Sequence, residues 1–268
     1  MNKRVHDKCM IVANGKSCLN SVRKEGYDYI IINSGGFLNI KPTLLILETI
    51  PMISSQGMNK FYPRSYLETN FDFEVISRII DYELLNLCQR FDPSRIYINS
   101  ENKLYGQLNP FRDLLHTLHL KKFRLSAKDS LSDYEEPLFN YFLNTYNTKL
   151  LDFRGSVIRA FSMALCMSYE QITFTGIDLS SNIHWWETRE SEGYLDDSAK
   201  HLINHFKAYT KLKPSFQCQH SGENSFLKPA SISECLVFCI KVAKTAFKNM
   251  GIKFPFISVD NQDPRTNL

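Results

Sequence analysis

The sequence predicts an α/β protein built on a doubly wound, mostly parallel sheet. Short apolar runs alternate with amphipathic stretches along the chain, a pattern typical of strands that are buried on both faces and joined by helices. Several of these runs end at a glycine or in a polar cluster, as strands do. The expected strands are Cys9–Ala13, Tyr27–Ile32, Thr43–Leu47, Arg95–Ile98, Phe123–Leu125, Gln171–Thr175 and Phe254–Val259.

Helices are expected where apolar residues recur at intervals of three and four. Ser156 is the expected N-cap of the second helix, and Glu234 forms a capping box with the first residue of the third. Gly251 supplies the C-terminal stop of that third helix. The three helices are Phe71–Phe91, Val157–Ser168 and Ser231–Met250.

Residues 179–222 interrupt the alternation of strands and helices. Ser, Asn, His, Trp, Asp and Glu dominate this stretch, and its one helical pattern is His201–Leu212. Long loops inside a compact domain are usually functional lids. We therefore expect one domain over residues 1–268, with residues 179–222 as a lid over the carboxyl edge of the sheet, where α/β proteins bind ligands.

Composition excludes several classes of protein. The formal net charge of +4 is too small for a typical nucleic-acid-binding domain. The seven cysteines are scattered without a C-x-x-C pair, which favours a reducing compartment over a disulfide framework or a zinc ribbon. No apolar run is long enough for a signal peptide or a bilayer span, so we expect a cytoplasmic protein that is at most peripheral to the membrane.

Three polar clusters follow or precede elements at the expected carboxyl edge. Asn14, Gly15 and Ser17 follow the first strand and form either a phosphate-binding turn or a structural turn. Asn33 follows the second strand and suits a ribose or pyrimidine edge, although an asparagine before glycines also forms simple turns. Arg154 precedes the helix that begins after Ser156, giving either an anion site or a well-capped helix.

No motif points to a metal or to a serine hydrolase. The nearest acidic motif, Asp72-Phe73-Glu74, opens the first predicted helix, where acidic residues are expected for the helix dipole alone. His116 and His119, like His201 and His205, have helical spacing but lack a matched third ligand. The nucleophile-elbow pattern is also missing from the sequence.

Both tryptophans of the chain lie in the expected lid, within His184-Trp185-Trp186-Glu187. Large aromatic side chains in a polar segment favour a stacking platform for a sugar or base, or an apolar latch onto the core. His220 ends the lid and can approach the same edge from the opposite side.

Taken in order, these pieces resemble the bacterial sialyltransferases of glycosyltransferase family 42. The family's opening strand runs into Asn-Gly-Pro-Ser, matched here by Ile11 to Ser17 with Lys16 in place of the proline. Its middle pattern is a Ser at a helix start, a helix of small residues, Leu-Gly-Tyr, a strand and Ser-Gly-Ile-Asp. The matching residues are Ser156, Ala160 to Met167, Ser168-Tyr169, Ile172 to Phe174 and Thr175-Gly176-Ile177-Asp178.

The resemblance implies a Rossmann-like fold of the GT-A variant type with a lid, and a CMP-activated sugar acid as donor without an obligatory metal. By position, the nucleotide would be held by Asn14, Gly15, Ser17, Asn33, Ser156, Gly176, Ile177 and Asp178. His220 would be the general base, and His184 is its competitor for that role. Family tyrosines that contact the leaving phosphate fall on Ser180 and Trp186, and Arg154 stands one residue from the family's arginine.

The leading hypothesis is thus a glycosyltransferase that moves sialic acid, Kdo, legionaminate or pseudaminate from CMP to an oligosaccharide or glycolipid acceptor. Such a role belongs to lipopolysaccharide or capsule biosynthesis in bacteria, and a peripheral membrane contact and a homo-oligomer are compatible with it. Two alternatives are a pterin pyrophosphokinase-like transferase, whose family has a similar Asn-Gly and Gly-Ile-Asp framework, and a nucleotide-binding protein without catalysis.

Overall fold

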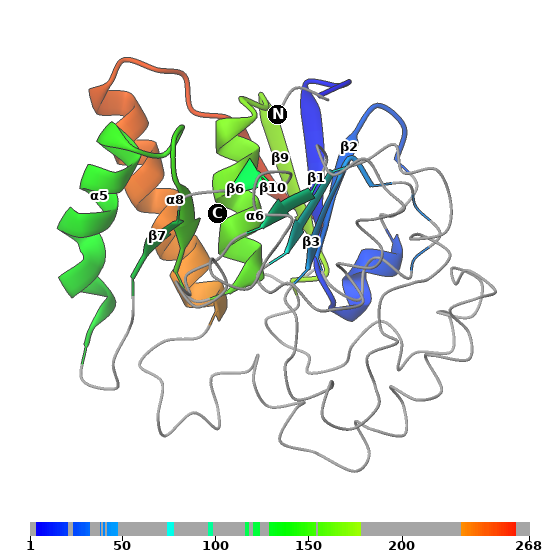
Figure 1. The fold of residues 1–268 in the computed structure, drawn as a ribbon, viewed down its shortest axis with the longest axis horizontal. Helices are drawn as coiled ribbons and strands as arrows, with labels where there is room; N and C mark the ends of the chain where they lie inside the picture. Colours follow the sequence, from blue (N-terminus) through cyan, green and yellow to red (C-terminus); the bar gives the residue numbers. More distant parts are fainter. Residues whose placement is uncertain are drawn as a thin grey trace, which may run out of the picture.

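A parallel sheet of eight strands forms the centre of the molecule in the part that the structure describes (Figure 1). The structure is a computed structural model, and it describes residues 4–20, 24–32, 38, 40, 42–47, 74–77, 96–98, 116–117, 120–123, 129–153, 155–177 and 232–260. The strands lie in the order β10-β9-β1-β2-β3-β4-β5-β6. They are β1 (Lys8–Val12), β2 (Asp28–Ile32), β3 (Leu44–Leu47), β4 (Glu74–Ser77), β5 (Ile96–Ile98), β6 (His116–Thr117), β9 (Gln171–Thr175) and β10 (Phe256–Val259).

The sheet is wound in both directions from β1, as the sequence predicts. From β1 the chain places β2 to β6 successively on one side, and it then returns to place β9 and β10 on the other side. Every strand pair in the sheet is parallel; for example, Ile11 lies opposite Ile30 of β2 and Phe174 of β9. The α/β class and the parallel sheet of Rossmann-like type are therefore confirmed.

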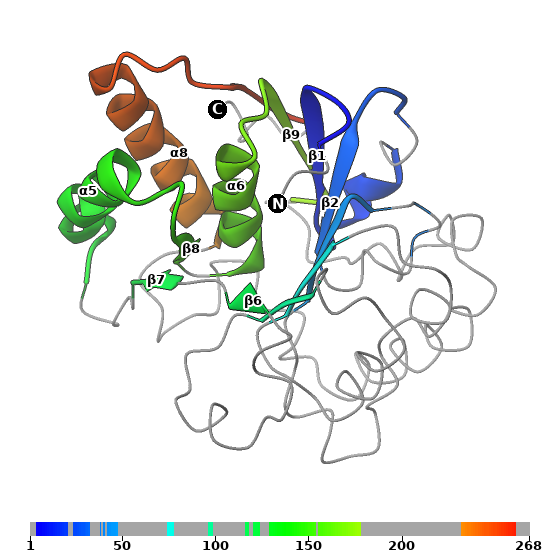
Figure 2. The same ribbon diagram turned by 45° about the horizontal axis from the view of Figure 1, so that its top comes forward.

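Three helices and a second small sheet cover one side of the main sheet. The small sheet pairs β7 (Leu120–Lys122) with β8 (Leu150–Asp152). The helices are α5 (Glu135–Asn144), α6 (Ser156–Cys166) and α8 (Ile232–Asn249). In both views α6 lies between α8 and the sheet, and α5 lies on the far side of α8 (Figures 1 and 2).

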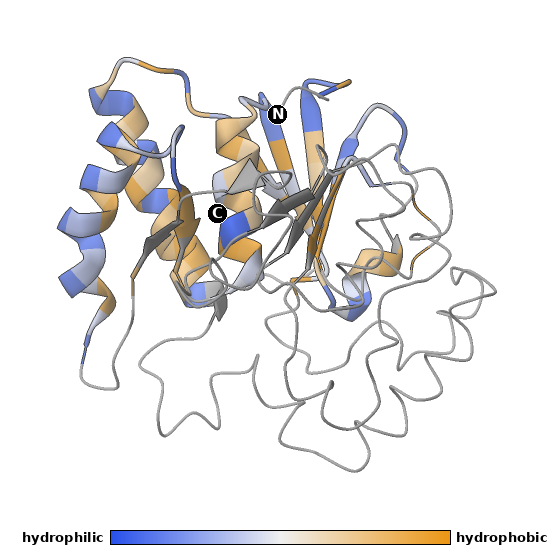
Figure 3. Ribbon diagram, in the orientation of Figure 1, coloured by the Kyte–Doolittle hydropathy of each residue, from blue (hydrophilic) through white to orange (hydrophobic). Residues whose placement is uncertain are grey.

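Burial explains why α6 occupies the inner position. All residues from Ser156 to Leu165 are buried, because α6 packs on β1, β2 and β3 with one face and on β8 and α8 with the other. Phe161 of α6 contacts Phe174 of β9 at 6.1 Å between ring centroids. Figure 3 shows the result: α6 is mostly hydrophobic, whereas α5 carries hydrophilic residues on its outer side.

Most expected elements are confirmed within a residue or two, and the third helix also ends as predicted. Gly251 has φ +69°, its N–H donates to the Lys248 carbonyl, and the N–H of Ile252 donates to the Phe247 carbonyl. This is the Schellman arrangement that a C-terminal glycine favours. The capping partner expected for Glu234, Ser231, lies outside the described residues.

The predicted helix Phe71–Phe91 is wrong where the structure describes it. Glu74–Ser77 is strand β4, and it pairs with β3 on one side and β5 on the other. A short apolar pair such as Val75-Ile76 satisfies both a strand and one turn of a helix, so periodicity alone cannot decide between them. Glu74 therefore opens a strand and not a helix, and the rest of the Asp72-Phe73-Glu74 motif lies outside the described residues.

Three further expectations need correction. The strand expected at Phe123–Leu125 lies earlier, at Leu120–Lys122, because those residues pair with β8. His116 is in strand β6, so it cannot share a helix face with His119. Helix α5 and strand β8 were not predicted at all. The expected lid at residues 179–222 lies outside the described residues, and the single domain over 1–268 stays a prediction.

A buried carboxylate ties the elements together at the amino edge of the sheet. Asp28, which is 2% exposed, accepts hydrogen bonds from the Tyr169 hydroxyl at 2.8 Å and from the backbone N–H groups of Val5 and His6. Arg4 stacks over the Tyr169 ring at 5.6 Å. The segment before β1, the start of β2 and the loop before β9 are thereby joined through one charge.

Burial sets the ionisation of the groups in this part of the core. It raises the pKa of the Tyr169 hydroxyl, and the hydrogen bond to Asp28 and the charge of that carboxylate raise it further. Burial also raises the pKa of the Cys166 thiol to about 12. The ordinary pKa values are 10.0 for a tyrosine hydroxyl and 9.0 for a cysteine thiol. Both groups thus stay neutral in the folded chain at a pH where the same groups of the unfolded chain have ionised.

We expect stability to fall in alkali and to depend on Tyr169. Because both folded pKa values are raised, their contribution is complete below about pH 9 and is lost as the pH rises further. Tyr169→Phe should lower the free energy of unfolding by about 1–3 kcal/mol at neutral pH, because a buried carboxylate loses a donor. The measurement is urea unfolding at neutral and alkaline pH.

Tyr146→Phe is the matched control. The Tyr146 ring packs on Phe247 at 5.0 Å between centroids, but its hydroxyl makes no hydrogen bond with a described residue. The Tyr146→Phe variant should lose at most about 0.5 kcal/mol of unfolding free energy at neutral pH. Equal losses in the two variants would contradict the role assigned to the Tyr169–Asp28 hydrogen bond.

Candidate functional site

The strand order reverses between β1 and β9, and this point is where a doubly wound sheet opens for a ligand. Connections leave β1 and β9 in opposite directions, and ligands of doubly wound sheets bind outside the carboxyl ends of such a strand pair. Asn14, Gly15 and Ser17 follow β1, whereas Gly176 and Ile177 follow β9. The structure thus brings together five of the residues that the sequence predicts for nucleotide binding.

Hydrogen bonds continue the pairing of β1 and β9 beyond the ends of both strands. The Ala13 N–H donates to the Thr175 carbonyl at 2.9 Å, and the Gly15 N–H donates to the Gly176 carbonyl at 2.8 Å. In return, the Gly176 N–H donates to the Ser17 Oγ at 3.0 Å, and the Thr175 hydroxyl donates to the Ser17 carbonyl at 3.3 Å. We call this set of contacts the β1–β9 junction.

Gly176 permits this close approach. Its φ is +72°, a conformation that residues with a side chain rarely adopt. A Cβ at this position would lie 2.5 Å from the Ala13 carbonyl oxygen and 2.8 Å from its carbon. Only glycine therefore fits where the second loop crosses the first.

Gly15 and Ser17 make structural contacts at this junction. The Gly15 N–H donates to the Gly176 carbonyl, and the Ser17 Oγ accepts a hydrogen bond from the Gly176 N–H and keeps its own hydroxyl hydrogen; the nucleotide contact expected for the two residues stays a prediction. Ser17 is the second residue of η1 (Lys16–Asn20), a 3-10 helix of five residues and not an α-helix whose N-terminus favours an anion. Gly15 and Ser17 therefore position the loop, and the half-buried Asn14 lies beside it.

Ser156 lies at the same edge of the sheet. α6 leads directly into β9 and runs antiparallel to it, so the first turn of α6 lies level with the carboxyl end of β9. Ser156 is the first helical residue, 8% exposed, and the N-cap is Gly155 at φ 135°. The predicted N-cap is thus displaced by one residue, because a glycine tolerates this φ and serine does not. The positive end of the helix dipole still points to this edge.

Arg159 is a residue of this region that the sequence analysis missed. It carries a charge yet is 1% exposed, and it lies one turn into α6. Side chains on a helix lean toward its N-terminus, so the guanidinium extends toward the end that begins at Ser156. An arginine inside an otherwise apolar helix was the signal that could have indicated it.

Six predicted site residues lie outside the described residues. They include the predicted base His220, the cation Arg154 before α6, and two further residues of the expected lid. The six are Asn33, Arg154, Asp178, His184, Trp186 and His220. Their roles stay predictions.

Two features of the described residues bear on the kind of site. Within the described ranges, no group of three or more His, Cys, Asp or Glu side chains is placed to hold a metal ion. The described helices include none that is long and apolar enough to cross a bilayer. Five cysteines among these residues are in the thiol form, and Cys235 and Cys239 are buried in the core.

Comparison with known proteins finds neither a matching family model nor a matching curated protein. Solved sialyltransferase structures are similar to this chain. The α-2,3-sialyltransferase Cst-I from Campylobacter jejuni is 14% identical, with 98% of this chain and 80% of that one covered and a TM-score of 0.47.

Two other structures from Campylobacter jejuni give similar values. An α-2,3-sialyltransferase in apo form is 12% identical over 100% of this chain and 80% of that one, at a TM-score of 0.42. The sialyltransferase CstII in complex with the substrate analogue CMP-3FNeuAc is 15% identical over 94% and 79%, at a TM-score of 0.39. Because all three TM-scores are below 0.5, the site assignment rests on this chain's own geometry.

Gly176→Ala tests whether the β1–β9 junction depends on the close approach. The variant should lose about 2–4 kcal/mol of unfolding free energy, because it combines a strained φ with a clash against Ala13. Gly251→Ala is the matched control: its φ is +69°, but no atom lies within 4 Å of the added Cβ. It should lose only about 1–2 kcal/mol. Equal losses, measured by urea unfolding, would show that Ala13 and Gly176 are not in close contact.

Proposed function

We propose that this chain is a glycosyltransferase that moves sialic acid or a related sugar acid from a CMP-activated donor to a glycan acceptor. Kdo, legionaminate and pseudaminate are the related donors. The observation that carries the proposal is the β1–β9 junction: the two loops that resemble the family pattern meet at the switch point of the sheet. Ser156, the third part of that pattern, lies at the same edge.

Backbone geometry supports the register of the resemblance. The family pattern has glycine in Leu-Gly-Tyr and in Ser-Gly-Ile-Asp. In this chain the corresponding residues, Ser168 and Gly176, have φ values of 57° and +72°. Both positions thus adopt the left-handed conformation that glycine favours, even where the residue is serine.

The donor would lie across the carboxyl ends of β1 and β9. The Asn14 side chain has both a donor and an acceptor and suits the ribose or the base. The first turn of α6 at Ser156 offers backbone N–H groups and a helix dipole to the phosphate. Asn33 follows directly on β2, the neighbour of β1, and Asp178 follows Ile177.

The transfer step needs one base and one stabilised leaving group. The acceptor hydroxyl oxygen attacks the anomeric carbon, the bond from that carbon to the phosphate oxygen of CMP breaks, and the hydroxyl proton passes to His220. A histidine with a pKa of about 6.5 is roughly three-quarters neutral at pH 7 and can accept that proton. Arg154 and the N-terminus of α6 would stabilise the departing phosphate, so we expect transfer to persist in EDTA.

Calorimetric titration with CMP, CDP, UMP, ATP and a pterin tests the nucleotide assignment. CMP should bind most tightly, and Asn14→Ala should weaken it by about 1–3 kcal/mol through lost hydrogen bonds. Asn144→Ala is the matched control, since Asn144 lies exposed on α5 and, among the described residues, its side chain bonds only to the Asn140 carbonyl. Tightest binding of ATP together with pterin, or an unchanged CMP affinity in Asn14→Ala, would reject the assignment.

The identity of the base is tested by comparing two histidines of the expected lid. His220→Ala should lower kcat by about a hundredfold to ten-thousandfold, the range for general base catalysis, with donor affinity nearly intact. The acidic limb of the kcat/KM profile should disappear in the same variant. His184→Ala should act mainly on substrate affinity; if it instead removes that limb, His184 is the base.

A further inference from the structure

One stretch near the end of the chain carries a charge equal to the whole excess of the protein. The formal net charge is +4, and residues 235–259 contain four lysines, no arginine and no acidic residue. Lys241, Lys244 and Lys248 lie on α8, and Lys253 follows its end. The remaining sequence has 32 − 4 = 28 basic and 28 acidic residues, so the net excess of the chain equals the charge of this stretch.

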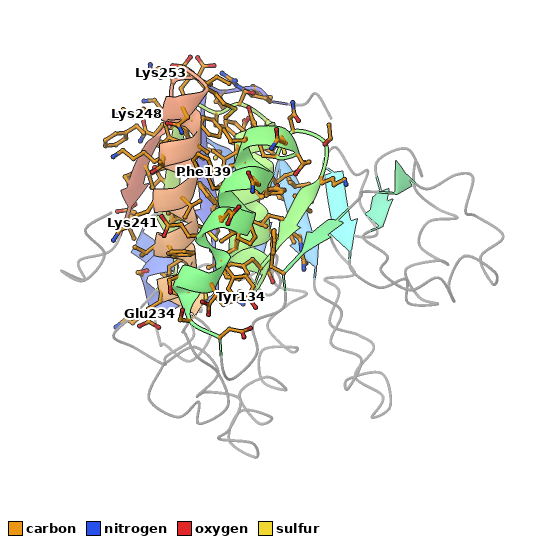
Figure 4. All side chains as sticks on the ribbon, turned by 90° about the vertical axis from the view of Figure 1, so that its left-hand side faces the viewer. Tyr134, Phe139, Glu234, Lys241, Lys248 and Lys253 are labelled. Atoms are coloured by element: carbon orange, nitrogen blue, oxygen red, sulfur yellow. The ribbon has the colours of Figure 1, made fainter. Side chains whose placement is uncertain are left out.

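The lysines share the outer face of α8. Lys241, Lys244 and Lys248 are three and four residues apart and all exposed, whereas Cys239, Ala243 and the other inner positions are buried. Figure 4 shows Lys241, Lys248 and Lys253 following one another toward the end of the helix, with Glu234 at the opposite end. We call residues 241–256 the α8 basic face.

Local structure does not account for these charges. None of the four lysines takes part in an ion pair with a described residue. A helix dipole favours cations only in its last turn, which explains Lys248 but neither Lys241 nor Lys244. The repulsion among neighbouring lysines is thus left uncompensated within the part of the chain that the structure describes.

Exposed apolar side chains adjoin the lysines. Ile252 is 46% exposed, and Phe256, at the start of edge strand β10, is 66% exposed. With Val5 they are the exposed large hydrophobic residues of the described ranges. Lysines next to an exposed aromatic and an exposed aliphatic side chain are the composition of surfaces that lie in the headgroup region of a bilayer.

The N-terminal ends of α8 and α5 carry negative charges, in contrast to the lysines toward the C-terminal end of α8. Glu234 at the start of α8 and Glu135 and Glu136 at the start of α5 are exposed. Both helices precede strands of parallel sheets, so their N-termini lie toward the carboxyl edge, where the candidate site is. An anionic surface would attract the α8 basic face and repel the edge that holds the site.

We propose that the α8 basic face binds the surface of an anionic lipid bilayer. Its lysines contact anionic headgroups, and Phe256 and Ile252 enter the boundary between headgroups and acyl chains. Phe256 opens β10 at the amino edge of the sheet, so the β1–β9 junction, at the carboxyl edge, lies away from the lipid that Phe256 enters. This binding is independent of the proposed transfer reaction and does not require it.

Flotation of the full chain with vesicles tests the proposal. Vesicles of equimolar phosphatidylcholine and phosphatidylglycerol should bind the protein, and phosphatidylcholine alone should not. The double variant Lys241→Gln/Lys248→Gln should lower the partition coefficient by about 30-fold, since each lysine near an anionic surface contributes about a factor of five. The control Lys16→Gln removes an exposed lysine at the carboxyl edge, away from Phe256, and should change it less than about threefold.

Phe256→Ser separates a membrane from a soluble polyanion. It should weaken vesicle binding about tenfold through the lost apolar burial and leave retention on heparin unchanged. Thermal melting confirms that each variant is folded. Equal vesicle binding by wild type and Lys241→Gln/Lys248→Gln would overturn the proposal. So would retention on heparin without vesicle binding, or a dimer that the same double variant dissociates while vesicles bind neither form.

Discussion

The close contact between the Gly176 loop and the Ala13 carbonyl is the constraint on which the candidate site depends. It lets the loops after β1 and β9 exchange hydrogen bonds beyond the ends of the strands, through Gly15 and Ser17. A side chain at residue 176 would push the loops apart. The N–H groups of Gly15 and Gly176 are used within the junction, so the ligand contacts that we propose fall on Asn14 and the first turn of α6.

The parts of the fold that the sequence predicts are those with unambiguous patterns. Runs such as Cys9–Ala13 and Gln171–Thr175 are short and end at turn residues, which favours central strands, and Gly251 directly after a long apolar stripe favours a helix end. The helix expected over Glu74–Ser77 failed because four residues fit either structure, and pairing with β3 and β5 is a long-range interaction that local spacing does not contain. α5 was missed because it buries few side chains, chiefly Leu138, Tyr141 and Phe142.

In the candidate site too, sequence reasoning found what local patterns show and missed what depends on contacts between distant segments. The family resemblance grouped Asn14, Gly15, Ser17, Gly176 and Ile177 around one nucleotide. The structure places them together because β1 and β9 are adjacent parallel strands, whose following loops meet at one edge. The contacts of Gly15 and Ser17 with Gly176 were missed because hydrogen bonds between loops distant in sequence are invisible in either loop alone. Arg159 was overlooked for a related reason: burial of a charge depends on packing against β8 and the main sheet. The proposed membrane face, in contrast, could be read from sequence as four lysines without an acid, but its exposure could not.

A crystal structure of the chain with bound CMP tests the central claim most directly. The account predicts that the nucleotide lies across the carboxyl ends of β1 and β9, with the Asn14 side chain and the first backbone N–H groups of α6 within hydrogen-bond distance, about 3 Å. The Gly15–Gly176 and Gly176–Ser17 hydrogen bonds should be unchanged. CMP bound at another edge of the sheet, or bound only after those two hydrogen bonds break, would contradict it.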